Sequence, residues 1–401
     1  MTMSVNARTG MIRTVAGNGE AGWSGDGGAA AVAACLNEPK AVALDRDGNL
    51  LIADSENHVI RKVDRTSGRI TTVAGCTSSH GSPLTVMKGA AVPPTDDPLS
   101  EGSSSAEAAF VQQSDLSGTV RYVVNGVGAT KRFAGDGGPA LEALLNFPTA
   151  IAVDAEGDLY IADTMNHRIR RVDAHTGRIT TIAGVGLPRF GGDGGPSVAA
   201  GLNEPVALVL LGTRLYIADQ SNNRIRMVDL RTGIITTIAG TGTATFNGDG
   251  RHATEAALAG PSGLTIGTDG RLYIADTFNG RIRAVDPSTG MIETVVGDGG
   301  EYRYQGESEA ASASLSRPSG MAVDLEGNLF LTDSDNHLVR RWDRMAGRID
   351  RVAGNGIANY GGDGEAPLEA SLNYPFGIVM DQQNHLFVAD TFNHRIREIV
   401  L

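Results

Sequence analysis

The chain lacks several features that mark common classes of protein. It has two cysteines, Cys35 and Cys76, too few for a framework of disulfide bonds. No apolar run is long enough to span a membrane, and residues 1–17 contain no charged and then apolar leader. Basic residues are outnumbered by acidic ones, 34 to 46, which gives a formal net charge of −12. We therefore expect a cytoplasmic protein, provided Met1 is its natural start, with no membrane partner and no nucleic-acid partner.

One motif recurs six times along the chain. Residues 52–61, with Asp54 at the third position, recur as residues 161–170 and then four times more. The motif aspartates are Asp54, Asp163, Asp219, Asp276, Asp333 and Asp390, with spacings of 109, 56, 57, 57 and 57. A period near 57 without any helix-length apolar stretch predicts a propeller or another closed array. The first junction carries about 52 extra residues, an insert at 76–128.

Each repeat predicts four short strands. In the second copy these are residues 149–154, 159–162, 169–172 and 178–183, separated by turns that contain glycine. The sixth copy stops at Leu401, after its third strand, and residues 9–17 match the missing fourth strand. The sequence thus predicts an all-β, six-bladed β-propeller over residues 1–401, closed by an N-terminal strand that completes the last blade and hides the sheet edges.

The motifs also carry a family resemblance. Gly-Asp-Gly-Gly-Pro, Leu-Asn-x-Pro and Gly-Asn-Leu-Tyr-Ile-Ala-Asp-Thr-x-Asn-His-Arg-Ile-Arg together resemble the NHL repeat, from about residue 9 to 401 outside the insert. The resemblance implies a six-bladed propeller. It also implies a binding platform or, as in related six-bladed families, a lyase, lactonase or cyclase, so it specifies the fold much better than the activity.

Residues that recur in every blade are expected to build the blade. We expect the motif aspartates to accept hydrogen bonds from backbone and asparagine donors, and the recurring histidines to pack rather than to bind metal. We expect the aspartates of the Gly-Asp-Gly loops to cap the short segments that follow, with calcium binding as the alternative. The aromatic residue two positions before each such glycine is expected to pack between blades, or else to line a funnel.

Residues that break the recurrence are the candidate site. The loops that lead into the inner strands and the loops between second and third strands should share one face, where sites on rigid scaffolds usually form. The candidates for substrate binding are Lys40, Met165, Phe278, Phe376 and Phe392. Glu56 and Asp335 are the candidate acid and base, with Arg303 as a third catalytic candidate, and ordinary rim charge is the alternative. No metal site and no cofactor are predicted.

The insert at 76–128 is the largest departure from the repeat. It includes a possible helix at Ala106–Gln113 and a strand-like segment at Thr119–Val124. It should leave the ring on the side of the candidate site, so we expect a lid or a long loop rather than a seventh blade.

Two classes of function remain open from the sequence. The first is a free-standing enzyme, a lyase, hydrolase or cyclase, whose lidded pocket takes a small, partly apolar molecule. The second is a non-catalytic scaffold that binds a protein or peptide on the same face. The apolar and charged residues of the rim favour the enzyme, although no Ser-His-Asp arrangement, metal triad or cofactor motif accompanies them.

Overall fold

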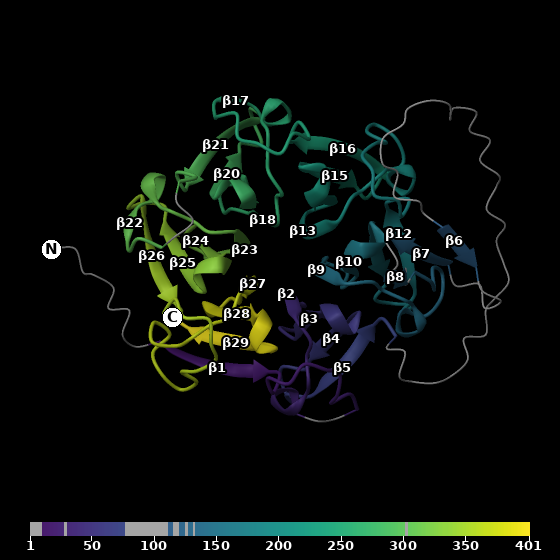
Figure 1. The fold of residues 1–401 in the computed structure, drawn as a ribbon, viewed down its shortest axis with the longest axis horizontal. Coiled ribbons are helices and arrows are strands. Elements are labelled where there is room, and N and C mark those ends of the chain that lie inside the picture. The colour runs from purple at the N-terminus through teal and green to yellow at the C-terminus, as the bar shows by residue number, and fades with distance from the viewer. Residues whose placement is uncertain are drawn as a thin grey trace. The chain divides into compact units, whose positions relative to one another are not determined.

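The structure is a computed structural model that describes residues 10–27, 30–76, 133–300 and 304–401, and the backbone of three strands between 111 and 130. The chain divides into two compact units, one formed by Met1–Cys76 with Phe133–Leu401 and one by Thr77–Arg132. The first unit is a ring of six antiparallel sheets, the six-bladed β-propeller that the sequence predicts (Figure 1). The helices in its described ranges are 3-10 turns of three residues.

Each blade holds four main strands, which follow one another from the centre of the ring outward. Blade 1 is β2 (Pro39–Leu44), β3 (Leu50–Asp54), β4 (Val59–Val63) and β5 (Ile70–Ala74). Blade 2 is β9 (Pro148–Val153), β10 (Leu159–Asp163), β11 (Arg168–Val172) and β12 (Ile179–Ala183). Blade 3 is β13 (Pro205–Leu211), β14 (Arg214–Asp219), β15 (Arg224–Asp229) and β16 (Ile234–Ala239).

The last three blades follow the same order. Blade 4 is β18 (Gly263–Ile266), β19 (Leu272–Asp276), β20 (Arg281–Val285) and β21 (Met291–Val296), edged by β17 (Arg251–His252). Blade 5 is β23 (Pro318–Val323), β24 (Leu329–Asp333), β25 (Leu338–Asp343) and β26 (Arg348–Ala353), edged by β22 (Ser308–Glu309). Blade 6 is β27 (Pro375–Met380), β28 (His385–Asp390), β29 (Arg395–Val400) and β1 (Met11–Ala16).

Two series of 3-10 turns repeat around the ring. The first joins the second and third strands of each blade: η2 (Ser55–Asn57), η4 (Thr164–Asn166), η6 (Gln220–Asn222), η8 (Thr277–Asn279), η10 (Ser334–Asn336) and η11 (Thr391–Asn393). The second precedes the inner strands: η1 (Ala31–Ala33), η3 (Ala140–Glu142), η5 (Ser197–Ala199), η7 (Ala253–Glu255) and η9 (Ala310–Ser312).

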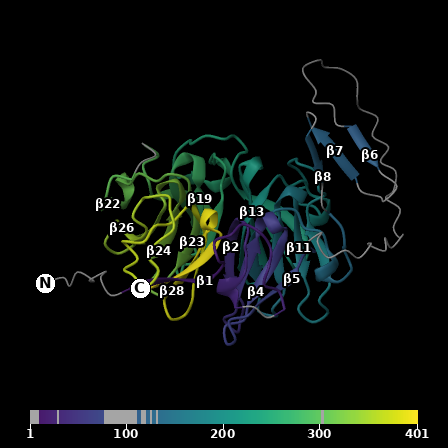
Figure 2. The same ribbon diagram turned by 60° about the horizontal axis from the view of Figure 1, so that its bottom comes forward.

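The N-terminal strand closes the ring. β1 pairs antiparallel with β29, with Met11 opposite Val400 and Ile12 opposite Ile399. Figure 1 shows the two strands side by side, and Figure 2 shows β1 in the same blade as β28. The inner strands contact one another in the order β2, β9, β13, β18, β23 and β27, and β27 returns to β2. The predicted closure is therefore confirmed, and it leaves β29 with a partner on both sides.

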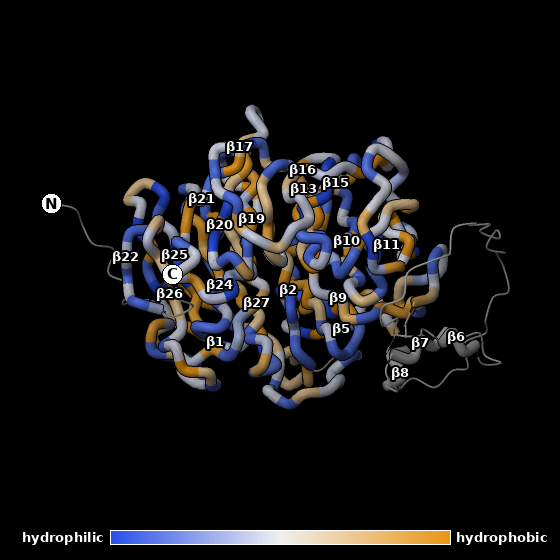
Figure 3. Tube along the Cα trace, turned by 45° about the horizontal axis from the view of Figure 1, so that its top comes forward, coloured by the Kyte–Doolittle hydropathy of each residue, from blue (hydrophilic) through white to orange (hydrophobic). Residues whose placement is uncertain are grey.

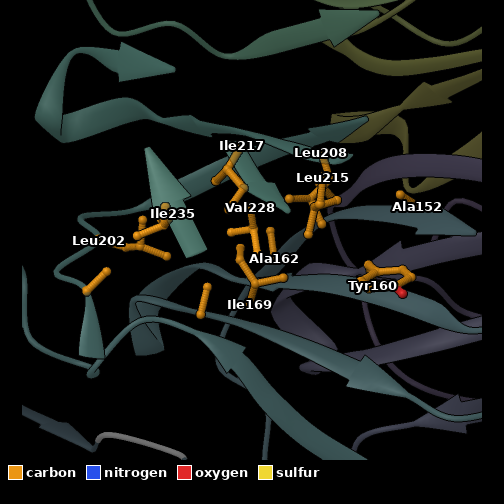
Figure 4. Close-up of a cluster of buried hydrophobic side chains, with 13 residues drawn as sticks. Ala152, Tyr160, Ala162, Ile169, Leu202, Leu208, Leu215, Ile217, Val228 and Ile235 are labelled. Atoms are coloured by element: carbon orange, nitrogen blue, oxygen red, sulfur yellow. The ribbon is translucent and has the colours of Figure 1, made fainter. Parts of the chain in front are cut away.

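The hydrophobic core consists of six clusters, one at each junction between neighbouring blades. At the junction of blades 2 and 3, Ile169 packs with Leu202 and Ile217, which are completely buried (Figure 4). Figure 3 shows apolar residues concentrated along the strands and polar residues along many connecting loops. A blade therefore buries its faces against its neighbours, as expected of a repeat unit that has no core of its own.

The second unit contains a three-stranded antiparallel sheet of β6 (Val111–Ser114), β7 (Val120–Val124) and β8 (Val127–Thr130). β7 matches the predicted strand. The predicted helix at Ala106–Gln113 is wrong where it overlaps β6, because those residues pair with β7, and its first part lies outside the described residues. The role of the insert as a lid stays a prediction.

Six buried arginines, one from the third strand of each blade, hold the loops of the ring in place. In blade 3, Arg226 Nη1 lies 3.2 Å from Asp219 Oδ2, and Nη2 lies 2.8 Å from Asp193 Oδ1 of the Gly-Asp-Gly loop. The inner pair recurs in all six blades at 3.1 to 3.3 Å. The outer pair recurs in five blades at 2.6 to 2.8 Å. The arginines are Arg61, Arg170, Arg226, Arg283, Arg340 and Arg397, each at most 1% exposed.

The inner aspartate of each blade also binds its own turn and the loop before the inner strand. Asp219 Oδ1 accepts a hydrogen bond from the Asn203 N–H at 2.7 Å, and Oδ2 accepts one from Asn222 Nδ2 at 2.8 Å. The predicted framework role is therefore confirmed. Burial raises the pKa of Asp219, and it raises the pKa of Asp54 to about 6, against the opposing effects of the hydrogen bonds and the nearby arginine.

The predicted capping role of the Gly-Asp-Gly aspartates is wrong. The N-cap positions of η1, η3 and η5 are Ala30, Pro139 and Pro196, none of which makes a side-chain capping bond. A guanidinium instead binds the carboxylate, because a buried cation needs a counter-charge more than a short turn needs a cap. The neighbouring aromatics stack on these arginines, as Phe190 does with its ring centre 4.9 Å from Arg226 Cζ.

Asp219→Asn is expected to lower the free energy of unfolding by about 3–5 kcal/mol, because it leaves the buried Arg226 with a single carboxylate at the rim. Urea unfolding followed by circular dichroism would measure the loss. The matched control is Asp193→Asn, which removes the other partner of the same arginine. That carboxylate is 38% exposed, so the loss should be about 1 kcal/mol or less. Equal losses in the two variants would contradict the unequal roles of the two aspartates.

Candidate functional site

The inner strands surround a central cavity of about 270 Å³. The residue after the strand-initial proline varies from blade to blade, and the next two positions are Ala or Gly and then a larger aliphatic residue. The variable residues are Lys40, Thr149, Val206, Ser262, Ser319 and Phe376. A side chain on Gly320 would overlap the carbonyl oxygen of Phe376, so the inner strands lie too close together for a larger residue there. The variable positions therefore give the cavity both polar and apolar side chains, and the positions that follow them on each strand are apolar.

Lys40 is a largely but not fully buried cation of the cavity. Its Nζ lies 3.2 Å from Glu38 Oε2, 4.4 Å from the ring centre of Phe376 and 4.9 Å from that of Phe392. Phe147 lies on a further side, with its ring centre 6.0 Å away. Burial lowers the pKa of Lys40, while the carboxylates of Glu38 and Glu56 raise it and Arg317 lowers it. The site thus holds an amine under opposing influences on its charge.

Arg317 is the second cation that lines the cavity. Its Nη1 lies 3.9 Å from Asp335 Oδ1, and its Cζ lies 5.8 Å from the ring centre of Phe278. Because 3.9 Å exceeds hydrogen-bond distance, the guanidinium keeps donors for a ligand on that side. Two of the predicted site residues, Asp335 and Phe278, therefore come together at Arg317.

The structure places the other predicted residues at the rim or outside the described ranges. Met165, Phe278 and Phe392 are 41%, 50% and 39% exposed. Glu56 lies exposed on η2 and influences Lys40 through its charge, but neither Glu56 nor Asp335 lines the cavity. Arg303 lies outside the described residues. The catalytic roles of these residues stay predictions.

The sequence reasoning missed the residue that precedes the proline of each inner strand. Glu38, Phe147, Glu204, Arg317 and Tyr374 all have left-handed backbone, with φ between 47° and 54°. This conformation is rare before proline and strained for residues other than glycine, and such strain is typical of functional sites. Three of these side chains contact Lys40 or line the cavity. These residues could have been found from the sequence, because in these five repeats a charged or aromatic residue stands before the proline that recurs in all six.

The reasoning also missed Gln220. In five blades the Ser or Thr that follows the motif aspartate donates to the proline carbonyl of the next blade at 2.6 to 2.8 Å, as Thr164 does to Pro205. Blade 3 has Gln220 at this position, and Gln220 lines the cavity. A framework hydroxyl has therefore been replaced by an amide that can bind a ligand.

The recurring histidines join neighbouring blades, which confirms their predicted structural role. His394 Nδ1 accepts a hydrogen bond from the Glu38 N–H at 3.2 Å, across the junction of blades 6 and 1. The same bond joins His58 to Phe147, His167 to Glu204 and His337 to Tyr374, at 3.0 to 3.2 Å. Asn223 Oδ1 replaces imidazole in blade 3 and accepts from the Gly260 N–H at 2.9 Å. These bonds hold the strained residues at the cavity.

Comparison with known proteins agrees with the geometry. The sequence model of the teneurin NHL domain matches residues 123–189 and 241–308, and that of the NHL repeat matches residues 36–62 and 372–399. The chain belongs to the NHL-repeat family. The matches of the two models include blades 2 and 4 and parts of blades 1 and 6.

Two curated relatives and one solved structure show what the NHL propeller is similar to. It is 33% identical to SUPPRESSOR OF QUENCHING 1, chloroplastic, of Arabidopsis thaliana, over 65% of this chain and 25% of that protein. It is 30% identical to NHL repeat-containing protein 2 of Bos taurus, over 63% of this chain and 39% of that protein. The chain thus spans well under half of each relative. A Bacteroides thetaiotaomicron protein of unknown function shares the fold, with a TM-score of 0.63, 18% identity and coverage of 98% of this chain and 76% of that one.

No helix in the part of the NHL propeller that the structure describes is long and apolar enough to cross a lipid bilayer.

His394→Asn is expected to make the NHL propeller less sensitive to acid. Burial lowers the pKa of His394, so its hydrogen bond with Glu38 is complete above the pKa of an unfolded histidine and is lost as the pH falls through the folded value. Glu38 opposes this shift, and Arg395 and Lys40 reinforce it. Asparagine keeps an acceptor, as Asn223 does, but does not titrate.

Melting temperatures of the wild type and His394→Asn between pH 8 and pH 5 test this expectation. The wild type should lose more stability than the variant over this range. The buried aspartates titrate in both proteins, so their effect cancels in the difference. A constant difference between the two proteins across the range would show that His394 does not titrate as expected.

Proposed function

We propose that the NHL propeller binds a small, partly apolar molecule in its central cavity and converts it, as a lyase, a hydrolase or a cyclase. The observation that carries the proposal is the largely buried Lys40, which lines the cavity and lies beside Glu38, Phe376 and Phe392. A cavity with a few polar groups among apolar ones is the usual form of a small-molecule site. Its volume of about 270 Å³ lies at the low end of the ~300–1,000 Å³ typical of such sites, which favours a small ligand.

The polar and apolar side chains that line the cavity would orient the ligand. The aliphatic residues of the inner strands would contact its apolar part, and Lys40, Arg317 and Gln220 would contact its polar part. Glu56 and Asp335 remain the candidates for proton transfer, because each lies near one of the two cations. The insert as a lid over this site is part of the proposal.

A protein- or peptide-binding scaffold is the second candidate function. Met165, Phe278 and Phe392 favour it, because each is at least 39% exposed although it is large and apolar. Exposed apolar side chains on a polar rim are typical of surfaces that bind a partner.

The other expectations about partners and location stay predictions. The six framework arginines are buried and paired, so they cannot contact an external phosphate backbone, which supports the absence of a nucleic-acid partner. The cytoplasmic location is open, since one relative is named as chloroplastic.

Phe376→Ala and Phe278→Ala distinguish the two functions. For a compound found by thermal-shift screening of a metabolite library, Phe376→Ala should raise Kd about tenfold or more, since Phe376 lines the cavity and its ring would lose buried contact with the ligand. Phe278→Ala should change Kd about twofold or less, because Phe278 lies on the rim. Isothermal titration measures both. The reverse order would favour the scaffold.

Glu56→Gln and Asp335→Asn test catalysis on the same compound. If these carboxylates transfer protons, each variant should lower kcat by about 10²–10⁴-fold while the melting temperature stays near that of the wild type. The matched control is Glu326→Gln, because Glu326 is 80% exposed in the turn between β23 and β24. Full turnover by both amide variants would show that these carboxylates are not the acid and the base.

A further inference from the structure

Lys40 differs from the other buried cations of the chain in a way that the framework does not explain. The chain contains four lysines, at positions 40, 62, 88 and 131, and it uses arginine for every buried framework cation. The equivalent positions in the other blades hold Thr, Val, Ser, Ser and Phe, so no repeat requirement places a lysine here. Arginine stays protonated in proteins, whereas a lysine amine can lose its proton and become a nucleophile.

The surroundings of Lys40 are those that activate an amine. Phenylalanine rings lie 4.4 and 4.9 Å from Nζ, the side chain is 13% exposed, and a second cation, Arg317, lines the same cavity. Desolvation among apolar groups and a neighbouring cation are the two usual means of producing a neutral, reactive lysine. Glu38 Oε2, 3.2 Å from Nζ, can take up the proton that the amine must release.

We propose that Lys40 forms an imine with a small 2-oxo acid bound in the central cavity. This inference rests on the proposed function, and it names the substrate class of the same site. Arg317 selects the acid, because its guanidinium lies 3.9 Å from Asp335 and keeps donors for a carboxylate, to which it can bind through two parallel hydrogen bonds. The carbonyl carbon of the ligand faces Lys40.

The reaction balances with the groups present. Glu38 accepts a proton from the Lys40 ammonium, and the amine lone pair forms a C–N bond to the carbonyl carbon. The carbonyl electrons move to oxygen, which takes up a proton from the newly bonded, positively charged nitrogen, so that a neutral carbinolamine results. Glu38 then returns its proton to the carbinolamine hydroxyl, the C–O bond breaks, and water leaves. The resulting iminium withdraws electrons from the adjacent C–C or C–H bond, which is the step that a lyase requires.

Reductive trapping of the full chain tests the inference. The protein is incubated with pyruvate and sodium cyanoborohydride near neutral pH, digested, and analysed by mass spectrometry for carboxyethyl groups on lysine. Lys62 is the internal control: it is 32% exposed and lies 2.7 Å from Asp45, so exposure alone would favour its labelling over that of Lys40. The neutral amine is the form that reacts, and burial lowers the pKa of Lys40, so Lys40 should label faster than Lys62 although it is less exposed.

Three variants and one control variant, Lys62→Arg, identify the groups that act. Lys40→Arg should abolish the adduct at this position, whereas Lys62→Arg should leave the labelling of Lys40 unchanged. Arg317→Gln should slow labelling by pyruvate but not by propanal, which has no carboxylate. Glu38→Gln should slow labelling by both compounds although loss of the carboxylate further lowers the pKa of Lys40, because the variant cannot return a proton to the carbinolamine hydroxyl. If Lys40→Arg fails to fold, the ratio of Lys40 to Lys62 labelling within the wild-type chain decides alone.

Labelling of Lys40 no faster than that of Lys62 overturns the inference. In that case, a compound that raises the melting temperature of the wild type but not that of Phe376→Ala would leave the proposed function intact. Lys40 would then contact the ligand as an ammonium group. If no compound in the metabolite library binds and no adduct forms, the proposed function fails together with the inference. Equal labelling by pyruvate and propanal would retain the imine but remove the selection of acids by Arg317.

Discussion

A guanidinium that is removed from water must have carboxylates beside it, and every blade of this ring buries one. Arg226 binds Asp219 of the turn between the second and third strands and Asp193 of the Gly-Asp-Gly loop, so one side chain fixes two loops. Asp219 in turn accepts a hydrogen bond from Asn203, just before the inner strand. Because loss of the buried Asp219 would leave the buried guanidinium with only the partly exposed Asp193, the position of the turn that carries Asp219 is strongly specified. The ion pairs inside the blades therefore fix the positions of the loops that form the rim of the cavity.

This arrangement allows side chains at the cavity to vary. The histidine of one blade binds the backbone N–H of the next, as His394 does with Glu38, and a backbone donor places no demand on the side chain beyond it. The strained, left-handed position before the proline can therefore hold Glu38, Phe147 or Tyr374 in different blades. The cost of the strain is offset by the frame, and the variable positions of the inner strands supply Lys, Thr, Val, Ser and Phe side chains to one cavity.

The fold could be predicted from the sequence because the repeat of about 57 residues, with four short strands in each copy, indicates a closed propeller. The match of residues 9–17 to the fourth strand of other blades predicted the pairing of β1 with β29, and the same comparison identified Lys40 and Phe376 as departures from the repeat. The partners of the Gly-Asp-Gly aspartates were not accessible, because a period shows that two residues recur without showing that they meet. In the sequence, Gln220 looks like a polar replacement for Ser or Thr. Only the structure shows that the Ser and Thr hydroxyls bond to a proline carbonyl of the next blade, as Thr164 does, whereas Gln220 lines the cavity. The left-handed backbone before each proline contradicts the usual preference of that position, so the tertiary structure overrides what the local sequence indicates.

The cavity combines a sixfold frame with an asymmetric lining. Lys40 and Arg317 belong to blades 1 and 5, on either side of blade 6 with Phe376, while Gln220 belongs to blade 3, opposite blade 6 in the ring. A ligand therefore meets positive charge and aromatic surface on one side and a neutral amide on the other. The repeated residues alone would present the same groups in every direction and could not orient a ligand. Recognition must then come from the positions at which the repeat is broken, and Lys40 is the one lysine among them.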